Sequence, residues 1–213
     1  MSAAVTRETA PTVIKLGGSF AASPYLADIL DDIAAATVPV VLVPGGGPFA
    51  DAVRTAQPRM GFGEAAAHRM ALMAMAQFAE ALASLAPGLR PSCGIAAIRA
   101  AWEGACVPVW SPWPLADGLE TLPESWQLTS DSLAAWLAGR LGAARLVMLK
   151  HRDPPASLAE AVTSGLVDPL FPGYAAARSG AELTWLGPAQ FPALRDMLRA
   201  DRPGPRAAER LSA

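Results

Sequence analysis

Two glycine-rich turns, each directly after a short apolar run, carry the residues best suited to hold a phosphate group. Gly17-Gly18-Ser19 follows residues 12–16, and Gly45-Gly46-Gly47 follows residues 38–43. Glycine lets the backbone come close to a ligand, and free N–H groups at a helix start point toward an anion. Lys15 stands inside the first run, where an ammonium group is costly to bury unless it meets an anion. The pair of turns predicts a phosphate site; the simpler alternative is two tight strand-to-helix turns and a lysine that reaches solvent.

Thr129, Ser130 and Asp131 stand at the start of a helical pattern over residues 131–142. Each of them can cap that helix, and a cap is the simplest interpretation. Asp131 has a second use to consider, because a carboxylate near the lysines of a phosphate site can hold them in place without touching the phosphate.

Lys150 follows the apolar run at residues 146–149. Ligands of open α/β sheets bind beyond the carboxyl ends of the strands, where both glycine turns are also expected. We therefore expect Lys150 near these turns as a second lysine of the phosphate site. The alternative is a solvated lysine beside His151 and Arg152.

His68 lies in a long helical pattern over residues 64–86, which Pro87-Gly88 ends. At about 100° per residue it falls away from the polar stripe of this helix, toward the apolar side. The stripe consists of Arg69, Gln77, Glu80 and Ser84. His68 is then either a core histidine with a satisfied hydrogen bond or a contact to the substrate near the second glycine turn.

The composition is that of a globular protein with a substantial core. Of 213 residues, 52% are hydrophobic and 17% are charged, and the net charge is −2. This net charge does not indicate the strongly basic surface that binding to nucleic acid or to membranes would use. No apolar run approaches the roughly 18 residues of a membrane span. The N-terminus lacks the apolar stretch of a secretion signal, so we expect a cytoplasmic protein. Cys93 and Cys106 show no metal-ligand spacing and are expected to be reduced and buried.

Apolar runs that alternate with helical patterns predict a mostly parallel sheet covered on both faces. The predicted strands are residues 12–16, 38–43, 106–110, 145–149 and 183–186. Residues 108–126 are rich in Trp and Pro and are expected to form an irregular loop that shapes a binding site. The ends, residues 1–10 and 201–213, are expected to fray.

Two common nucleotide-binding signatures do not apply. The chain has no G-x-x-x-x-G-K-[ST] motif, so it is not a P-loop protein. Residues 61–66 fit G-x-G-x-x-A, but the preceding residues 57–60 do not have a strand pattern, which argues against a dinucleotide-binding turn.

In this order along the chain, three motifs resemble those of the amino acid kinase family, which includes aspartate-, glutamate- and uridylate-kinase-like enzymes. They are Ile14-Lys15-Leu16-Gly17-Gly18-Ser19, Val43-Pro44-Gly45-Gly46-Gly47-Pro48-Phe49 and Thr129-Ser130-Asp131-Ser132-Leu133-Ala134. The resemblance implies one domain over residues 1–213 with an α/β fold: a three-layer αβα sandwich around a mostly parallel open sheet. It further implies an acceptor-binding half at about residues 12–128 and a nucleotide-binding half at about residues 129–200.

The same resemblance implies a role for each candidate residue. Lys15, Asp131 and Lys150 would be catalytic, with the lysines neutralising the transferring phosphoryl group and the carboxylate organising them. ATP phosphates would be bound by Lys15, Gly17, Gly18, Ser19, Thr129, Ser130 and Asp131. The acceptor would be bound by Gly45, Gly46, Gly47 and His68. Mg²⁺ would be carried by ATP, without a metal ligand from the protein.

Residues 67–75 and 124–132 resemble an archaeal and methylotroph branch of the family that acts in methanofuran biosynthesis and one-carbon metabolism. This branch implies transfer of the ATP γ-phosphoryl group to an acceptor that already carries a phosphate. The sequence departs from the family pattern after Lys150, where residues 151–156 read His-Arg-Asp-Pro-Pro-Ala in place of the usual aspartate- and glycine-bearing loop. The usual glycine–threonine end motif is also missing, and Gly187-Pro188 and the tail from Asp201 stand where it is expected. These departures leave two alternatives: a kinase-like binding or regulatory subunit without ATP turnover, and a kinase for another small phosphate or carboxylate. The Ala/Met-rich helix 64–86 would suit a homodimer.

Overall fold

The computed structural model describes residues 10–153, 155–177 and 180–199. The ends that we expect to fray therefore lie almost entirely outside the described residues. Among the described residues, no helix combines the length and the hydropathy that crossing a membrane requires.

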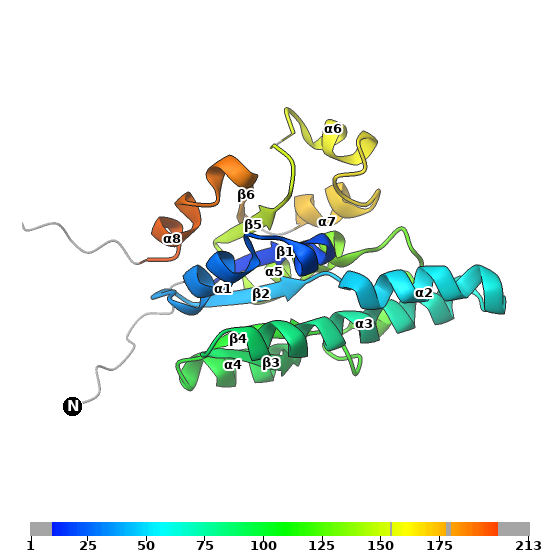
Figure 1. Ribbon diagram of the computed structural model, residues 1–213, viewed down its shortest axis with the longest axis horizontal. Coiled ribbons are helices and arrows are strands. Elements are labelled where there is room, and N and C mark those ends of the chain that lie inside the picture. The colour runs from blue at the N-terminus through cyan, green and yellow to red at the C-terminus, as the bar shows by residue number, and fades with distance from the viewer. Residues whose placement is uncertain (1–9, 154, 178–179, 200–213) are drawn as a thin grey trace, which may run out of the picture.

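Six parallel strands form one open sheet in the order β3-β4-β2-β1-β5-β6, which confirms the predicted fold class. The strands are β1 (Thr12–Leu16), β2 (Val40–Pro44), β3 (Leu89–Cys93), β4 (Val107–Ser111), β5 (Arg145–Leu149) and β6 (Glu182–Leu186). Every residue of β1 and β2 is buried, as expected for central strands covered on both faces. In Figure 1, β3 and β4 lie at one end of the sheet and β6 at the other.

Helices cover both faces of the sheet and form two apolar cores. They are α1 (Leu26–Ala34), α2 (Gly47–Met60), α3 (Glu64–Leu85), α4 (Gly94–Glu103), α5 (Ser130–Leu141), α6 (Leu158–Thr163), α7 (Phe171–Ala177) and α8 (Ala193–Met197). Short 3₁₀ helices, η1 to η3, span Gly18–Ala22, Leu119–Thr121 and Pro188–Gln190. One core contains residues of α4, α5, α6 and α7, and the other contains residues of α1 and α8, while α3 contributes to both. Figure 1 shows α2 and the start of α3 extending beyond the carboxyl end of β2.

Residues 61–66 connect two helices rather than a strand and a helix. Gly61 ends α2 with a left-handed φ of 75°, and Gly63 precedes the first turn of α3. This geometry confirms that the glycines there do not form a dinucleotide-binding turn.

The structure corrects three details of the sequence analysis. Leu89–Cys93 forms the edge strand β3, which the sequence did not predict because Arg90 and Pro91 interrupt its apolar pattern. The irregular loop begins after Ser111 rather than at residue 108, because Val107–Ser111 is strand β4. Cys93 and Cys106 are free, as expected, but they are half-buried rather than buried.

Candidate active site

Lys15, Asp131 and Lys150 meet at the carboxyl edge of the sheet. The ammonium nitrogens Nζ of Lys15 and Lys150 lie 2.7 Å and 2.9 Å from the same carboxylate oxygen, Oδ1 of Asp131. Strands β1 and β5 pair in parallel with Leu16 opposite Leu149, so Lys150 emerges one residue beyond the paired segment. Asp131 comes from the first turn of α5, whose N-terminus faces this edge. The structure thus joins three predicted residues that are far apart in the sequence.

These are the only two lysines of the chain, although it contains fifteen arginines. Lysine carries a compact charge on a flexible stem, whereas arginine presents a broad planar fork. Every cationic side chain outside this cluster, histidines aside, is therefore an arginine, and both compact ammonium groups converge on one carboxylate. The rarity of lysine in the sequence therefore points to Lys150 as a functional residue independently of any motif comparison.

The cluster is buried and carries a net positive charge. Lys15, Asp131 and Lys150 are 4%, 6% and 9% exposed, and two ammonium groups face one carboxylate. Burial alone would raise the pKa of Asp131, but the attraction of Lys15 and Lys150 outweighs it and holds that pKa below its usual value. Burial and the repulsion from Lys15 lower the pKa of Lys150 to about 8, although Asp131 opposes this shift. The net charge of this cluster favours an anion beside it.

Asp168 is a buried carboxylate that the sequence analysis did not identify. It is 6% exposed and accepts hydrogen bonds from the backbone of Thr129 and Ser132 at the start of α5 and of Leu170 and Phe171 at the start of α7. The hydroxyl groups of Thr129 and Ser132 donate to it as well. Its position just before an apolar helical run is a capping signal, but its contacts to α5 span 36 to 39 residues and have no local signature.

The hydrogen bonds to Asp168 decide which donors at the start of α5 remain available to a phosphate group. The N–H and the hydroxyl of Thr129 both donate to Asp168, and the hydroxyl oxygen accepts from the N–H of Asp131 at 3.3 Å. Thr129 is thus the N-cap of α5, and its donors are used within the protein. Ser130 lines a cavity beside this helix start.

The two glycine turns touch each other. A side chain on Gly18 would collide with the backbone of Gly47, and one on Gly45 would collide with the backbone of Gly18. The N–H of Gly45 donates to the carbonyl of Leu16 at 2.8 Å, which ties the second turn to the end of β1. A Cβ atom on Gly17 would lie 3.6 Å from Nζ of Lys15, so this turn passes directly beside the lysine cluster. Ser19 is exposed within η1.

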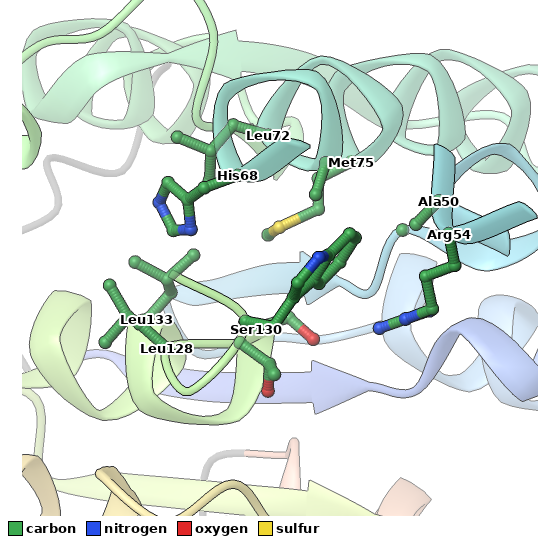
Figure 2. A pocket seen from close by; sticks show the side chains of 12 residues that line it. Ala50, Arg54, His68, Leu72, Met75, Leu128, Ser130 and Leu133 are labelled. Atoms are coloured by element: carbon green, nitrogen blue, oxygen red, sulfur yellow. The ribbon is translucent and has the colours of Figure 1, made fainter. Parts of the chain in front are cut away.

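A cavity of about 40 Å³ lies between α3 and the start of α5 (Figure 2). His68, Leu72 and Met75 project into it from α3, opposite Leu128, Ser130 and Leu133. Gly46 lines the cavity as well, whereas the lining does not include the other two glycines of the second turn. The structure thus places His68 beside the second glycine turn, as the sequence predicted.

The segment from Leu122 to Thr129 is held against α2 and α3 by several polar contacts. The indole N–H of Trp126 donates to Oε1 of Gln57 at 2.7 Å, and the guanidinium of Arg54 lies 4.6 Å from the indole centre. Arg69 donates twice to the Glu124 carboxylate, at 2.8 Å each. Together these contacts fix the loop that closes one side of the cavity.

His68 also takes part in holding this loop. Its Nδ1 lies 3.1 Å from the carbonyl oxygen of Ser125, an arrangement that requires a proton on Nδ1. Burial lowers the pKa of His68 despite that hydrogen bond. A neutral ring with the proton on Nδ1 leaves Nε2 as an acceptor for a ligand.

Residues 151–153, which follow β5, contact the turn after β6. Both segments lie on the side of β1 that faces away from β2 and the second glycine turn. The His151 ring stacks on Phe20 with centroids 3.8 Å apart, and a side chain on Gly187 would collide with the carbonyl of Arg152. The two segments that depart from the family pattern are therefore in contact. No group of three or more metal-ligating side chains occurs among the described residues.

Several solved structures share this fold at low sequence identity. The uridylate kinase from Archaeoglobus fulgidus is 17% identical, with a TM-score of 0.64 over 86% of this chain and 95% of that chain. An isopentenyl phosphate kinase is 19% identical, with a TM-score of 0.54 over 88% and 96%. The carbamate kinase from Giardia lamblia bound to AMP-PNP is 11% identical, with a TM-score of 0.54 over 88% and 95%.

A search of curated proteins finds no significant match. The sequence pattern of the amino acid kinase family, in contrast, matches residues 10–153, which is more than half of the chain. The lysine–aspartate–lysine cluster and both glycine turns fall within this match. The chain belongs to the amino acid kinase family, a family of small-molecule kinases.

Proposed function

We propose that this protein is an ATP-dependent phosphotransferase that acts on a small acceptor already carrying a phosphate. The observation that carries the proposal is the convergence of Lys15 and Lys150 on Asp131 beside two touching glycine turns. Phosphoryl transfer needs alignment and fixed positive charge around the equatorial oxygens, and little covalent chemistry from the protein. The cluster supplies that charge from groups held in place before the substrate arrives.

In the proposed reaction, an oxygen of the acceptor phosphate forms a bond to the γ-phosphorus while the bond to the β–γ bridging oxygen breaks. Lys15 and Lys150 stabilise the charge that develops on the transferring group and on ADP. Asp131 orients both ammonium groups and does not touch the phosphate. Backbone N–H groups at Gly17 and Gly18, with Ser19 and Ser130 nearby, border the ATP phosphates. Thr129 supports the start of α5 and uses its donors within the protein.

The described residues fit a metal carried by the nucleotide. Asp131 is engaged by two ammonium groups, so it is not a free ligand for a cation. Mg²⁺ carried by ATP would offset part of the charge of the phosphate groups. In this proposal the protein binds the metal through ATP.

We assign the acceptor to the half formed by about residues 12–128 and the nucleotide to about residues 129–200. The cavity supports the first assignment, because it is lined by Gly46, His68 and apolar side chains and has room for a few water-sized groups. This combination suits a small acceptor with an apolar body and an anionic end. A homo-oligomer in the cytoplasm, without nucleic-acid or membrane partners, completes the proposal.

For the acceptor itself we propose aminomethylfuran phosphate, which would be converted to the diphosphate in methanofuran-type cofactor biosynthesis. The support comes from the sequence segments that contain His68 and Asp131 and from the apolar lining of the cavity. A kinase for another small phosphate or carboxylate uses the same cluster and differs only at this cavity.

One observation favours a non-catalytic alternative. Residues 151–153 are His-Arg-Asp, without the glycine expected near the nucleotide, and His151 packs on Phe20. A binding or regulatory subunit that has lost ATP turnover would tolerate this change.

The test is ADP formation with Mg-ATP and a panel of acceptors: aminomethylfuran phosphate, unphosphorylated aminomethylfuran, UMP, isopentenyl phosphate and carbamate. We expect turnover with the first and none with the second, and a Lys15→Ala control should be inactive. Turnover of UMP, isopentenyl phosphate or carbamate alone would reject the methanofuran assignment and keep the kinase. Absence of both turnover and Mg-ATP binding by calorimetry would reject the kinase.

A further inference from the structure

We infer that Asp168 is a positioning residue that sets the geometry of the Lys15–Asp131–Lys150 cluster. The inference rests on the proposed phosphotransferase function, because it assigns a role within the same site. Asp168 does not touch the cluster and would act through Thr129 and the start of α5. Its role would therefore be indirect, and the variants must separate this role from simple helix capping.

Asp168 joins the beginnings of two helices. Its Oδ1 accepts from the N–H groups of Leu170 and Phe171 and from the hydroxyl of Ser132. Its Oδ2 accepts from the N–H groups of Thr129 and Ser132 and from the hydroxyl of Thr129. Ionised carboxylate oxygens can accept all six bonds, whereas an amide at this position would direct two N–H donors at groups that are themselves donors.

A buried carboxylate of this kind is an expensive way to cap a helix. None of the ion pairs within residues 10–153, 155–177 and 180–199 includes Asp168, and the contacts that these residues give its carboxylate are hydrogen bonds at the starts of α5 and α7. A hydroxyl or amide oxygen serves as an ordinary cap without that desolvation cost. The arrangement is explained if rigid placement of the α5 start matters more than stability.

The link to Asp131 passes through one hydroxyl group. The hydroxyl of Thr129 donates its proton to Asp168 at 2.7 Å, which directs its lone pairs toward the N–H of Asp131, 3.3 Å away. Asp131 is therefore fixed at its backbone by Thr129 and at its side chain by the two lysines.

The same segment also holds Lys150 directly. Its Nζ donates to the carbonyl oxygen of Leu166 at 2.5 Å, two residues before Asp168. Residues 166–168 thus hold Asp131 through Thr129 and the ammonium group of Lys150 through a backbone carbonyl. Movement of this segment would change the separation between the carboxylate and Lys150.

The test uses the fact that the chain has only two lysines. Labelling with ¹³Cε-lysine gives two side-chain NMR signals, and Lys15→Arg identifies the one from Lys150. The groups that face Lys150 are Lys15 on β1 and Asp131 on α5, so its titration reports their placement. We expect Thr129→Val and Asp168→Asn each to lower the Lys150 midpoint by roughly 1 unit, because attraction to Asp131 weakens while burial remains.

Two control variants distinguish this role from a general loss of stability. Thr129→Ser keeps the hydroxyl and should keep the midpoint of the unmodified protein. Phe171→Leu keeps the backbone donor to Asp168 but removes packing between α7 and α5, so it should lower the melting temperature without moving the midpoint. An unchanged midpoint in folded Thr129→Val overturns the inference, and this variant decides the question even if Asp168→Asn does not fold.

Kinetics provide the second readout. With an active acceptor, Thr129→Val should lower kcat by about 10–100-fold, as loss of outer-shell support does at metal sites, with little change in the KM for ATP. A fall in kcat for Phe171→Leu equal to that for Thr129→Val would overturn the positioning role. If no acceptor turns over in the unmodified protein, the proposed function fails, whereas the lysine titration still decides whether Asp168 positions the cluster.

Discussion

Lys15 is buried in the middle of the sheet, and its only ionic partner within the described residues is Asp131. Substitution by alanine should preserve the fold, because Asp131 keeps its ion pair with Lys150. Loss of a charge that acts in the transition state should lower kcat by about 10²–10³-fold or more. The measurements are steady-state rates and the melting temperature of Lys15→Ala. Turnover close to that of the unmodified protein would end the catalytic assignment.

Asp131→Asn should reduce turnover more than it reduces stability. The cap of α5 is the Thr129 hydroxyl rather than the Asp131 side chain, so the helix start survives the change. The two buried ammonium groups, however, lose their counter-charge, and Lys150 should give up its proton at lower pH. Parallel measurement of kcat and of unfolding in urea tests this difference. Equal activity of the two proteins would make Asp131 a purely structural residue.

The pKa of Lys150 predicts a loss of activity in mild alkali. The charged form exists below a pKa of about 8, so kcat/KM should fall as the pH rises through that value. Stability should move in the opposite sense: between about 8 and the ordinary value of 10.5, the unfolded chain binds more protons than the folded one, which favours folding as pH rises. A pH–rate profile and thermal melts over the same range check both signs. Lys150→Arg, which stays charged, should remove the alkaline decline even if its maximum rate is lower.

At the scale of residues, the sequence predicted the members of the site better than their connections. Lys15 and the glycines stand out because each conflicts with its surroundings unless a ligand or a close contact explains it. Asp168 does not stand out in the sequence, because its partners Thr129 and Ser132 lie 39 and 36 residues away. Only the packing of α7 on α5 brings them together. Spacing within one segment cannot reveal such a contact.

At the scale of elements, the loop that ends at Thr129 forms one side of the cavity that we propose for the acceptor. His68→Ala should remove both a ligand contact and the hydrogen bond to Ser125, and should raise the acceptor KM roughly 10-fold, the effect of about 1.4 kcal/mol. The KM for ATP should stay nearly unchanged. Initial rates with one substrate varied at a time give both constants, and an equal rise in both would place His68 outside the acceptor site.

Arg69→Ala is the matched control on the same helix. Arg69 and Glu124 are 41% and 38% exposed, and an exposed ion pair contributes at most about 1 kcal/mol. The loop keeps the Trp126–Gln57 hydrogen bond and the His68–Ser125 contact in this variant. Both KM values should therefore change little.

The elements themselves follow closely from the sequence where their residues face a core on both sides. β1 and β5 match their predicted ranges because every position in them is apolar, apart from Lys15 and the first residue of each strand. β3 differs because an edge strand with Arg90 and Pro91 needs no continuous apolar run, so only its pairing with β4 identifies it.

At the scale of the whole molecule, the strand order places the lysine cluster and both glycine turns at the centre of the sheet. β1 lies between β2, which leads into the second glycine turn, and β5, which leads into Lys150. In the proposed function, the acceptor and the nucleotide would therefore bind on adjacent sides of β1. We expect a bisubstrate analogue that links ATP to the acceptor phosphate to bind more tightly than either substrate alone, as calorimetry can measure. Affinity no better than that of ATP would argue against adjacent subsites.

The scarcity of lysine has a consequence for proteolysis. A protease that cuts only after lysine has two cleavage sites in this chain, after Lys15 in the centre of the sheet and after Lys150 at the mouth of the site. Both side chains are buried, and neither terminal segment outside the described residues contains a lysine. Cleavage after Lys15 therefore reports opening of the whole sheet. Cleavage after Lys150 reports local opening at the carboxyl ends of the strands. The native protein should resist this protease, and a ligand that seats its phosphates on the cluster should slow the second cut more than the first.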